Sequence, residues 1–174
     1  MTDLNKPVIV LVRPQLGENI GKAARAMLNF GLTEMRLVAP RDGWPNPSAG
    51  PAASGADIVL EQAKVYATTA EAVADCRLVL GCTARSRRVA LDELLPREAA
   101  ARAVADATVG AEVALVFGRE YAGLTNEELQ RCHFHVHIPS DPAFSSLNLA
   151  AAVQVLAYEV RMAWLATEGQ PVKQ

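Results

Sequence analysis

Runs of strand-forming residues alternate with runs of helical periodicity along nearly the whole chain, and this alternation restricts the possible folds more than any other feature. Strands that alternate with helices pair in parallel and are covered on both faces. The sequence therefore predicts one α/β domain on a largely parallel sheet. The expected strands are 8–12, 35–38, 78–81, 113–117 and 134–138, and the expected helices are 20–30, 70–75, 96–105, 126–131 and 147–165.

Length and composition set the outer limits of this domain. With 174 residues, of which 51% are hydrophobic, the chain can bury one core. We expect a domain over residues 1–166 and a flexible tail over 167–174, where Gly and Pro follow the last helix. The sequence shows neither an uninterrupted apolar run of about 18 residues nor a signal-peptide pattern. We therefore expect a soluble, cytoplasmic protein that does not associate with a membrane.

Charge and cysteine content argue against a broadly basic nucleic-acid-binding surface and against a framework of disulfides. Seventeen Lys and Arg against 19 Asp and Glu leave a net charge of −2, so the composition lacks the basic excess of many nucleic-acid binders. Any contact with RNA must then depend on local sites. Cys76, Cys82 and Cys132 are odd in number and widely spaced, which predicts reduced, structural thiols.

The first segment that could contribute residues to a functional site is the predicted helix within residues 19–32. Asn19 suits the N-cap and Gly31 suits a left-handed C-cap, while the apolar residues between them form one face. Arg25 falls on the opposite face. Taken alone, it is a solvated surface residue.

The second segment, residues 114–129, is a buried strand that ends at Gly118 and leads to a helix capped at Thr125. Glu128 completes a capping box with Thr125. Ligands of parallel α/β sheets bind at the carboxyl ends of strands, so the loop from Gly118 to Gly123 is a candidate site; an ordinary strand, turn and helix is the alternative. The sequence has neither the GxGxxG nor the GxxxxGK[ST] motif, which excludes the usual dinucleotide and P-loop interpretations.

The third segment, residues 137–155, carries a polar turn into the longest predicted helix. Ser145, Ser146 and Asn148 cluster where that helix begins, and helix N-termini present free N–H groups. Capping alone would need one of these three residues. Capping alone therefore does not account for the cluster.

A row of histidines suggests a different class of function. His133, His135 and His137 alternate along one predicted strand and point to one face, where they could hold a metal for a hydrolase. No Asp, Glu or Cys stands at ligand spacing beside them, and exposed strand faces are commonly polar. We therefore expect no metal.

Two further segments allow more than one interpretation. The helix 147–165 is apolar nearly all round, so it is either a central core helix or shares its surface with a second subunit; we expect a homodimer. The segment from Pro40 to Gly55 is rich in Gly, Pro and Ser and is longer than a simple connector. It is either a binding loop or a mobile one.

Together with GCTARSRR at residues 81–88, the three segments resemble the motifs of the SPOUT RNA methyltransferases, over about residues 8–164. The sequences of these motifs are most similar to those of the bacterial TrmJ type, which methylates the ribose of tRNA nucleotide 32. The resemblance implies a sheet with a C-terminal deep trefoil knot, a homodimer, tRNA as partner and S-adenosylmethionine as methyl donor. Relatives often continue into a C-terminal extension, whereas this sequence stops at Gln174, as a natural short form or a trimmed one.

The resemblance also implies roles for single residues. Arg25 acts in catalysis with Ser146 and Asn148, and Asn19 and Glu120 orient the other groups. Because the pKa of Arg is too high for a proton acceptor, we expect Arg25 to bind the adjoining phosphate, which takes the ribose proton. The donor residues are Thr83, Ala84, Arg85, Gly118, Ile138, Ser145, Ser146 and Leu147, and RNA contacts include Arg25, Arg87 and Arg88.

Three alternatives remain at this point. A close relative could act on another tRNA position or on rRNA, because the motifs define the donor and the ribose chemistry but not the nucleotide. A non-catalytic RNA-binding module and a metal-dependent hydrolase that uses the histidine row are the others. Neither of these two needs S-adenosylmethionine, so donor binding separates them from the first interpretation.

Overall fold

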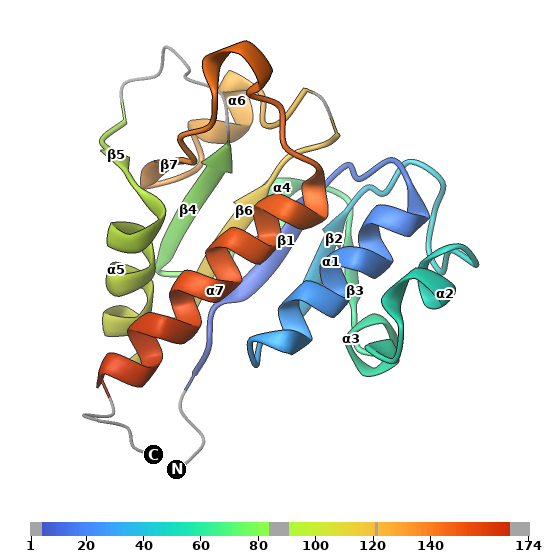
Figure 1. Cartoon of the computed structure of the whole chain (residues 1–174), viewed down its shortest axis with the longest axis horizontal. Coiled ribbons are helices and arrows are strands. Elements are labelled where there is room, and N and C mark those ends of the chain that lie inside the picture. The colour runs from blue at the N-terminus through green and yellow to red at the C-terminus, as the bar shows by residue number, and fades with distance from the viewer. Residues whose placement is uncertain (1–4, 84–90, 121, 168–174) are drawn as a thin grey trace.

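The structure is a computed structural model that describes residues 5–83, 91–120 and 122–167. Within them, seven parallel strands form one sheet in the order β3-β2-β1-β6-β4-β7-β5 (Figure 1). The predicted parallel α/β architecture is confirmed. The strands are β1 Val8–Val12, β2 Met35–Val38, β3 Lys64–Tyr66, β4 Leu78–Thr83, β5 Glu93–Leu94, β6 Val113–Phe117 and β7 Phe134–His137.

Helices cover both faces of the sheet. Alternate residues of β1 enter different cores: Ile9 and Leu11 pack on the face of the long helices, and Val8 and Val10 on the other. The long helices are α1 Gly17–Asn29, α5 Pro96–Thr108 and α7 Leu149–Thr167. Beside α1 lie α2 Ala49–Ala53 and α3 Asp57–Glu61, and the opposite face carries α4 Thr69–Ala72 and α6 Asn126–Leu129 (Figure 1).

The start of α1 differs from the prediction. The helix begins at Gly17, and Asn19 is a buried residue of its first turn rather than the N-cap. The reason is tertiary, because a carboxylate from residue 120 accepts the backbone N–H groups that precede the helix. Two expectations are confirmed: Gly31 has φ +84°, and Arg25 is exposed.

The segment between Pro40 and Gly55 was predicted as a loop, but its second half contains helix α2. This helix packs closely on α1 at Gly21, where a Cβ atom would overlap the carbonyl oxygen of Ala49. The short edge strands β3 and β5 were also absent from the prediction. Three and two residues carry too little periodicity to be recognised from sequence.

Helix α7 packs between α5 and α1 (Figure 1). It is long and apolar enough to cross a membrane, by length and composition only, although Glu159 and Arg161 interrupt it. Its six buried residues belong to the core beside the sheet, as expected for a core helix. The remaining apolar side chains of α7 include Tyr158 and Met162, which are exposed.

Candidate active site

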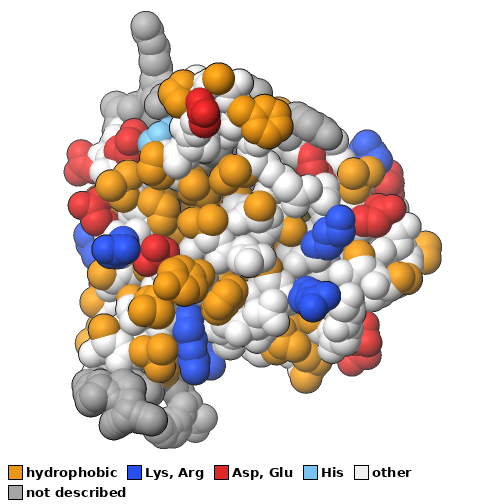
Figure 2. Space-filling view, in the orientation of Figure 1, with side chains coloured by type: hydrophobic (Ala, Val, Ile, Leu, Met, Phe, Trp, Pro, Cys, Tyr) orange, Lys and Arg blue, Asp and Glu red, His pale blue; other side chains and the backbone are white. Residues whose placement is uncertain are grey.

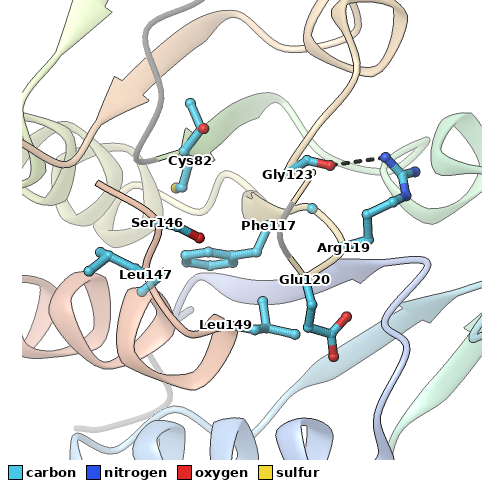
Figure 3. Close-up of a pocket in the computed structure, with 11 residues that line it drawn as sticks. Cys82, Phe117, Arg119, Glu120, Gly123, Ser146, Leu147 and Leu149 are labelled. Carbon is cyan, nitrogen blue, oxygen red and sulfur yellow. Dashed lines mark hydrogen bonds between the residues drawn. The ribbon is translucent and has the colours of Figure 1, made fainter. Parts of the chain in front are cut away.

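A pocket of about 60 Å³ lies at the carboxyl ends of β4 and β6, beside the start of α7. Its position at the carboxyl ends of the strands is the usual one for ligand sites in parallel α/β sheets. Figure 3 shows side chains from all three segments around it. The lining residues are Cys82, Thr83, Phe117, Gly118, Arg119, Glu120, Gly123, Ser146, Leu147, Leu149 and Ala152.

The loop after β6 is closed tightly on itself at Gly118. A Cβ atom there would overlap the backbone of Gly123 and Leu124, so only glycine permits this approach. Arg119 fixes the closure, because its guanidinium donates to the Gly123 carbonyl at 2.9 Å and to Glu128 at 2.6 Å (Figure 3). The predicted capping box between Thr125 and Glu128 is present and anchors the far end of the loop.

The side chain of Glu120 extends from this loop and stabilises the start of α1. Its carboxylate accepts hydrogen bonds from the backbone N–H of Gln15 at 2.8 Å, from that of Leu16 at 3.0 Å and from the Asn19 amide at 2.9 Å. Burial alone would raise the pKa of Glu120, but the bonds from Asn19 and these backbone groups outweigh it and leave the pKa below its ordinary value. The carboxylate is therefore ionised at neutral pH and orients its neighbours.

Asn19 links Glu120 to the third segment. Its side-chain oxygen accepts a hydrogen bond from the Asn148 amide at 3.2 Å, and the oxygen of Asn148 accepts from the backbone N–H of Ala150 at 2.9 Å. Asn148 thus caps α7 while it contacts α1. Asn19 thus joins residues that lie 101 and 129 positions later in the sequence, and the three segments meet in one hydrogen-bonded chain.

The predicted donor loops also meet. The backbone N–H of Ile138, after β7, donates to the carbonyl of Thr83 at 3.0 Å, which joins the ends of two neighbouring strands. Ser146 extends into the pocket near Phe117 (Figure 3), and both Ser146 and Asn148 are exposed to solvent. The hydroxyl of Ser140 donates to the Ser145 carbonyl at 2.9 Å and steadies the turn before α7.

The predicted donor residues divide into three groups. Four line the pocket, namely Thr83, Gly118, Ser146 and Leu147. Ile138 and Ser145 are their chain neighbours or contacts but do not line it. Ala84 and Arg85 lie outside the described residues, as do Arg87 and Arg88, which were predicted to contact RNA. Sequence reasoning missed Cys82, Phe117, Leu149 and Ala152, whereas Arg119 and Gly123 fall within the loop from Gly118 to Gly123 that it predicted as a candidate site.

Arg25 lies away from this pocket. It is exposed on α1, six residues after Asn19, which corresponds to about 9 Å along the helix axis. The described lining residues do not include it. Figure 2 shows Lys and Arg side chains on the surface over α1, so this helix presents positive charge to solvent.

The histidine row does not form an exposed face. His135 is buried, with 1% of its surface exposed, because β7 lies between β4 and β5 and is covered by the core. The Nδ1 atom of His133 accepts a hydrogen bond from the backbone N–H of Val79 at 2.9 Å. Within the described ranges, no group of three or more His, Cys, Asp or Glu could hold a metal ion.

The cysteines are consistent with the prediction of reduced thiols. Cys76, Cys82 and Cys132 are free. Burial raises the pKa of Cys132 and of Cys76 to about 12 and that of Cys82 well above its usual value. A thiol that stays protonated is a poor nucleophile and metal ligand. We therefore assign the cysteines no part in the chemistry of the site.

Comparison with known proteins adds independent evidence. The model of the SpoU rRNA Methylase family matches residues 6–158. The tRNA (cytidine/uridine/adenosine-2'-O-)-methyltransferase TrmJ of Pseudomonas aeruginosa strain UCBPP-PA14 is 57% identical over 98% of the chain. The chain spans 66% of the length of that relative, which is just under two thirds.

Solved structures show the same fold. The crystal structure of TrmJ from Z. mobilis ZM4 superposes with a TM-score of 0.87 at 55% identity, over 95% of this chain and 70% of that one. The SpoU methyltransferase AviRb from Streptomyces viridochromogenes, in complex with the cofactor AdoMet, is a more distant match. Its TM-score is 0.73 at 21% identity, over 98% of this chain and 61% of that one, which supports the fold alone.

Proposed function

Since the chain belongs to the SpoU rRNA methylase family, we propose that it transfers a methyl group from S-adenosylmethionine to a ribose 2′-hydroxyl of tRNA, at nucleotide 32 of the anticodon loop. The observation that carries the proposal is the hydrogen-bonded chain from Glu120 through Asn19 to Asn148, because it assembles all three motif segments at one pocket. The relatives named as tRNA 2′-O-methyltransferases support the substrate.

In this proposal the pocket holds the methyl donor. Gly118, Ser146 and Leu147 line it, and backbone groups in such loops can recognise an adenine edge and an amino acid without charged side chains. Thr83, Ala84, Arg85, Ile138 and Ser145 are proposed to complete the donor site. The donor supplies a methyl group on a sulfonium, and attack by the ribose oxygen needs near in-line placement.

The acceptor side is proposed to lie where the motifs meet solvent. Ser146 and Asn148 are exposed and hold the ribose, while Glu120 and Asn19 keep Asn148 in place. Arg25 would bind the adjoining phosphate, and that phosphate would accept the hydroxyl proton when the methyl group exchanges its bond to the donor sulfur for a bond to the ribose oxygen. Arg87 and Arg88 are proposed to contact the RNA as well.

Donor binding tests the proposal directly. We expect the purified protein to bind S-adenosylmethionine, or its demethylated product, in calorimetry with a chelator present, because the lining groups are backbone and neutral side chains for the most part. Methyl transfer to tRNA and mass spectrometry of the digested product then identify the nucleotide. Absence of heat at high micromolar donor, or heat only after zinc is added, would reject the proposal in favour of a metal-dependent function.

A homodimer is the second expectation. Tyr158 and Met162 on α7 are each 46% exposed, and a groove of about 430 Å³ beside them is lined by residues of α5 and α7. A second copy would cover this apolar surface. Light scattering after gel filtration should give about twice the 18.6 kDa of the chain, and Met162→Asp should shift the mass toward the monomer. A wild-type mass near 18.6 kDa at micromolar concentration would contradict it.

The remaining family properties are proposals of the same kind. We propose that the methyltransferase domain comprises residues 1–166, that its C-terminal part is threaded as a deep trefoil knot, and that the protein acts in the cytoplasm on tRNA. The support is the match of the family model across residues 6–158 together with the TrmJ relatives.

A further inference from the structure

An exposed aromatic ring stands beside the pocket. Phe144 is 83% exposed in η1 Pro142–Phe144, the 3-10 turn between β7 and α7. It lies two residues before Ser146, which lines the pocket, so at most about 7 Å of chain separates them. In Figure 1 the turn lies beyond the carboxyl ends of the strands, and Figure 2 shows hydrophobic side chains on that part of the surface.

The backbone around Phe144 is firmly held. The carboxylate of Asp141 accepts from the backbone N–H of Ala143 at 2.9 Å, and its carbonyl accepts from the N–H of Phe144 at 2.8 Å. The Ser140 hydroxyl donates a hydrogen bond to the carbonyl of Ser145, the residue that follows Phe144. In the part of the chain that the structure describes, no aromatic or cationic group contacts the ring. An ordered turn thus presents a free aromatic face to solvent.

We propose that Phe144 stacks on a base of the RNA, at or next to the nucleotide whose ribose is methylated; this inference rests on the proposed function. Aromatic rings stack on bases of any sequence at centroid distances of about 4.5–7 Å. A ribose at Ser146 and Asn148 puts its base, or the neighbouring one, within that reach. Asp141 in the same turn repels phosphate, which leaves a base as the contact.

The stack has a functional consequence for the target. Single-stranded loops are recognised through unstacked bases that are held on aromatic side chains. Phe144 would hold such a base beside the donor pocket, so the ring positions the acceptor and takes no part in bond making. Its loss should therefore weaken RNA binding and leave donor binding unchanged.

Three variants and one probe test the inference. Phe144→Ala removes the ring, Phe144→Trp keeps a stacking surface, and Val109→Ala is the matched control. Val109 is also 83% exposed, but it follows α5 and lies near the amino end of β6, away from the pocket. The probe is full-length tRNA that the wild-type protein methylates, with 2-aminopurine beside the methylated nucleotide. Affinity, kcat, KM and probe fluorescence are measured for each.

We expect Phe144→Ala to raise the Kd and the KM for tRNA about tenfold or more, and to abolish the fluorescence quenching that stacking causes. Phe144→Trp should restore both, and Val109→Ala should behave as wild type. Unchanged tRNA affinity and quenching in Phe144→Ala would overturn the inference. A change in the mass of the protein in solution, measured by light scattering, would also overturn it, because the ring would then be a contact between subunits. A wild-type protein that fails to bind the donor would instead reject the proposed function.

Discussion

Replacing Arg25 by Ala is expected to lower the rate of methyl transfer by on the order of a hundredfold or more, with fold and donor affinity retained. Arg25 is exposed on α1, where loss of a side chain changes the free energy of unfolding by only about 0.5 kcal/mol. It does not line the described pocket, so the donor should bind as before. Single-turnover methylation, thermal unfolding and calorimetry measure the three quantities.

The matched control is Lys22→Ala, which removes another exposed cation from the same helix. If positive charge over α1 were sufficient, the two variants would lose activity equally. Arg25→Lys refines the test, because it keeps the charge but loses the planar fork that binds phosphate through two hydrogen bonds. We expect it to be nearly as inactive as Arg25→Ala. Wild-type rates in Arg25→Ala would show that Arg25 is a solvated surface residue.

Gly118→Ala is expected to reduce donor affinity by about tenfold or more and to lower the melting temperature by several degrees. The added Cβ would overlap the backbone of Gly123 and Leu124, and backbone cannot swing aside as a flexible side chain can. Overpacking of this kind costs about 1–3 kcal/mol, which for a chain of this size corresponds to roughly 2–12 °C. The loop must open, and the hydrogen bond from Arg119 to Gly123 is lost.

Gly50→Ala is the control for the Gly118 variant. Gly50 lies in α2, and no atom lies within 4 Å of the position that its Cβ would take. Ala is also a better helix former than Gly, so stability should be unchanged or slightly raised. Calorimetry with the donor and thermal unfolding of both variants provide the comparison. Equal donor affinity in Gly118→Ala and wild type would show that this loop does not bind the donor.

The sequence alone determined the layered architecture and most of the elements. Strands β1, β2 and β6 have the predicted bounds, because each is a buried apolar run that ends at turn residues. The capping box of α6 and the left-handed Gly31 were also predicted, since both depend on contacts within a few residues. Local physics was sufficient at these positions.

Other features depended on partners that are distant in sequence. Asn19 looked like an N-cap, yet the start of α1 is held by Glu120, 101 residues later. His135 belonged to an apparently exposed row, yet the core covers β7. In both cases the local pattern is compatible with two environments, and the packing decides between them.

The candidate site shows the same division. Residue types and their order predicted Gly118, Ser146 and Leu147 as pocket residues, but not that Phe117 and Leu149 would lie beside them. The relation of Glu120, Asn19 and Asn148 also required the tertiary structure. The sequence determined which segments carry chemistry, because residue types set it. Only the tertiary structure decided which atoms meet, because long-range hydrogen bonds and close backbone approaches have no local periodicity.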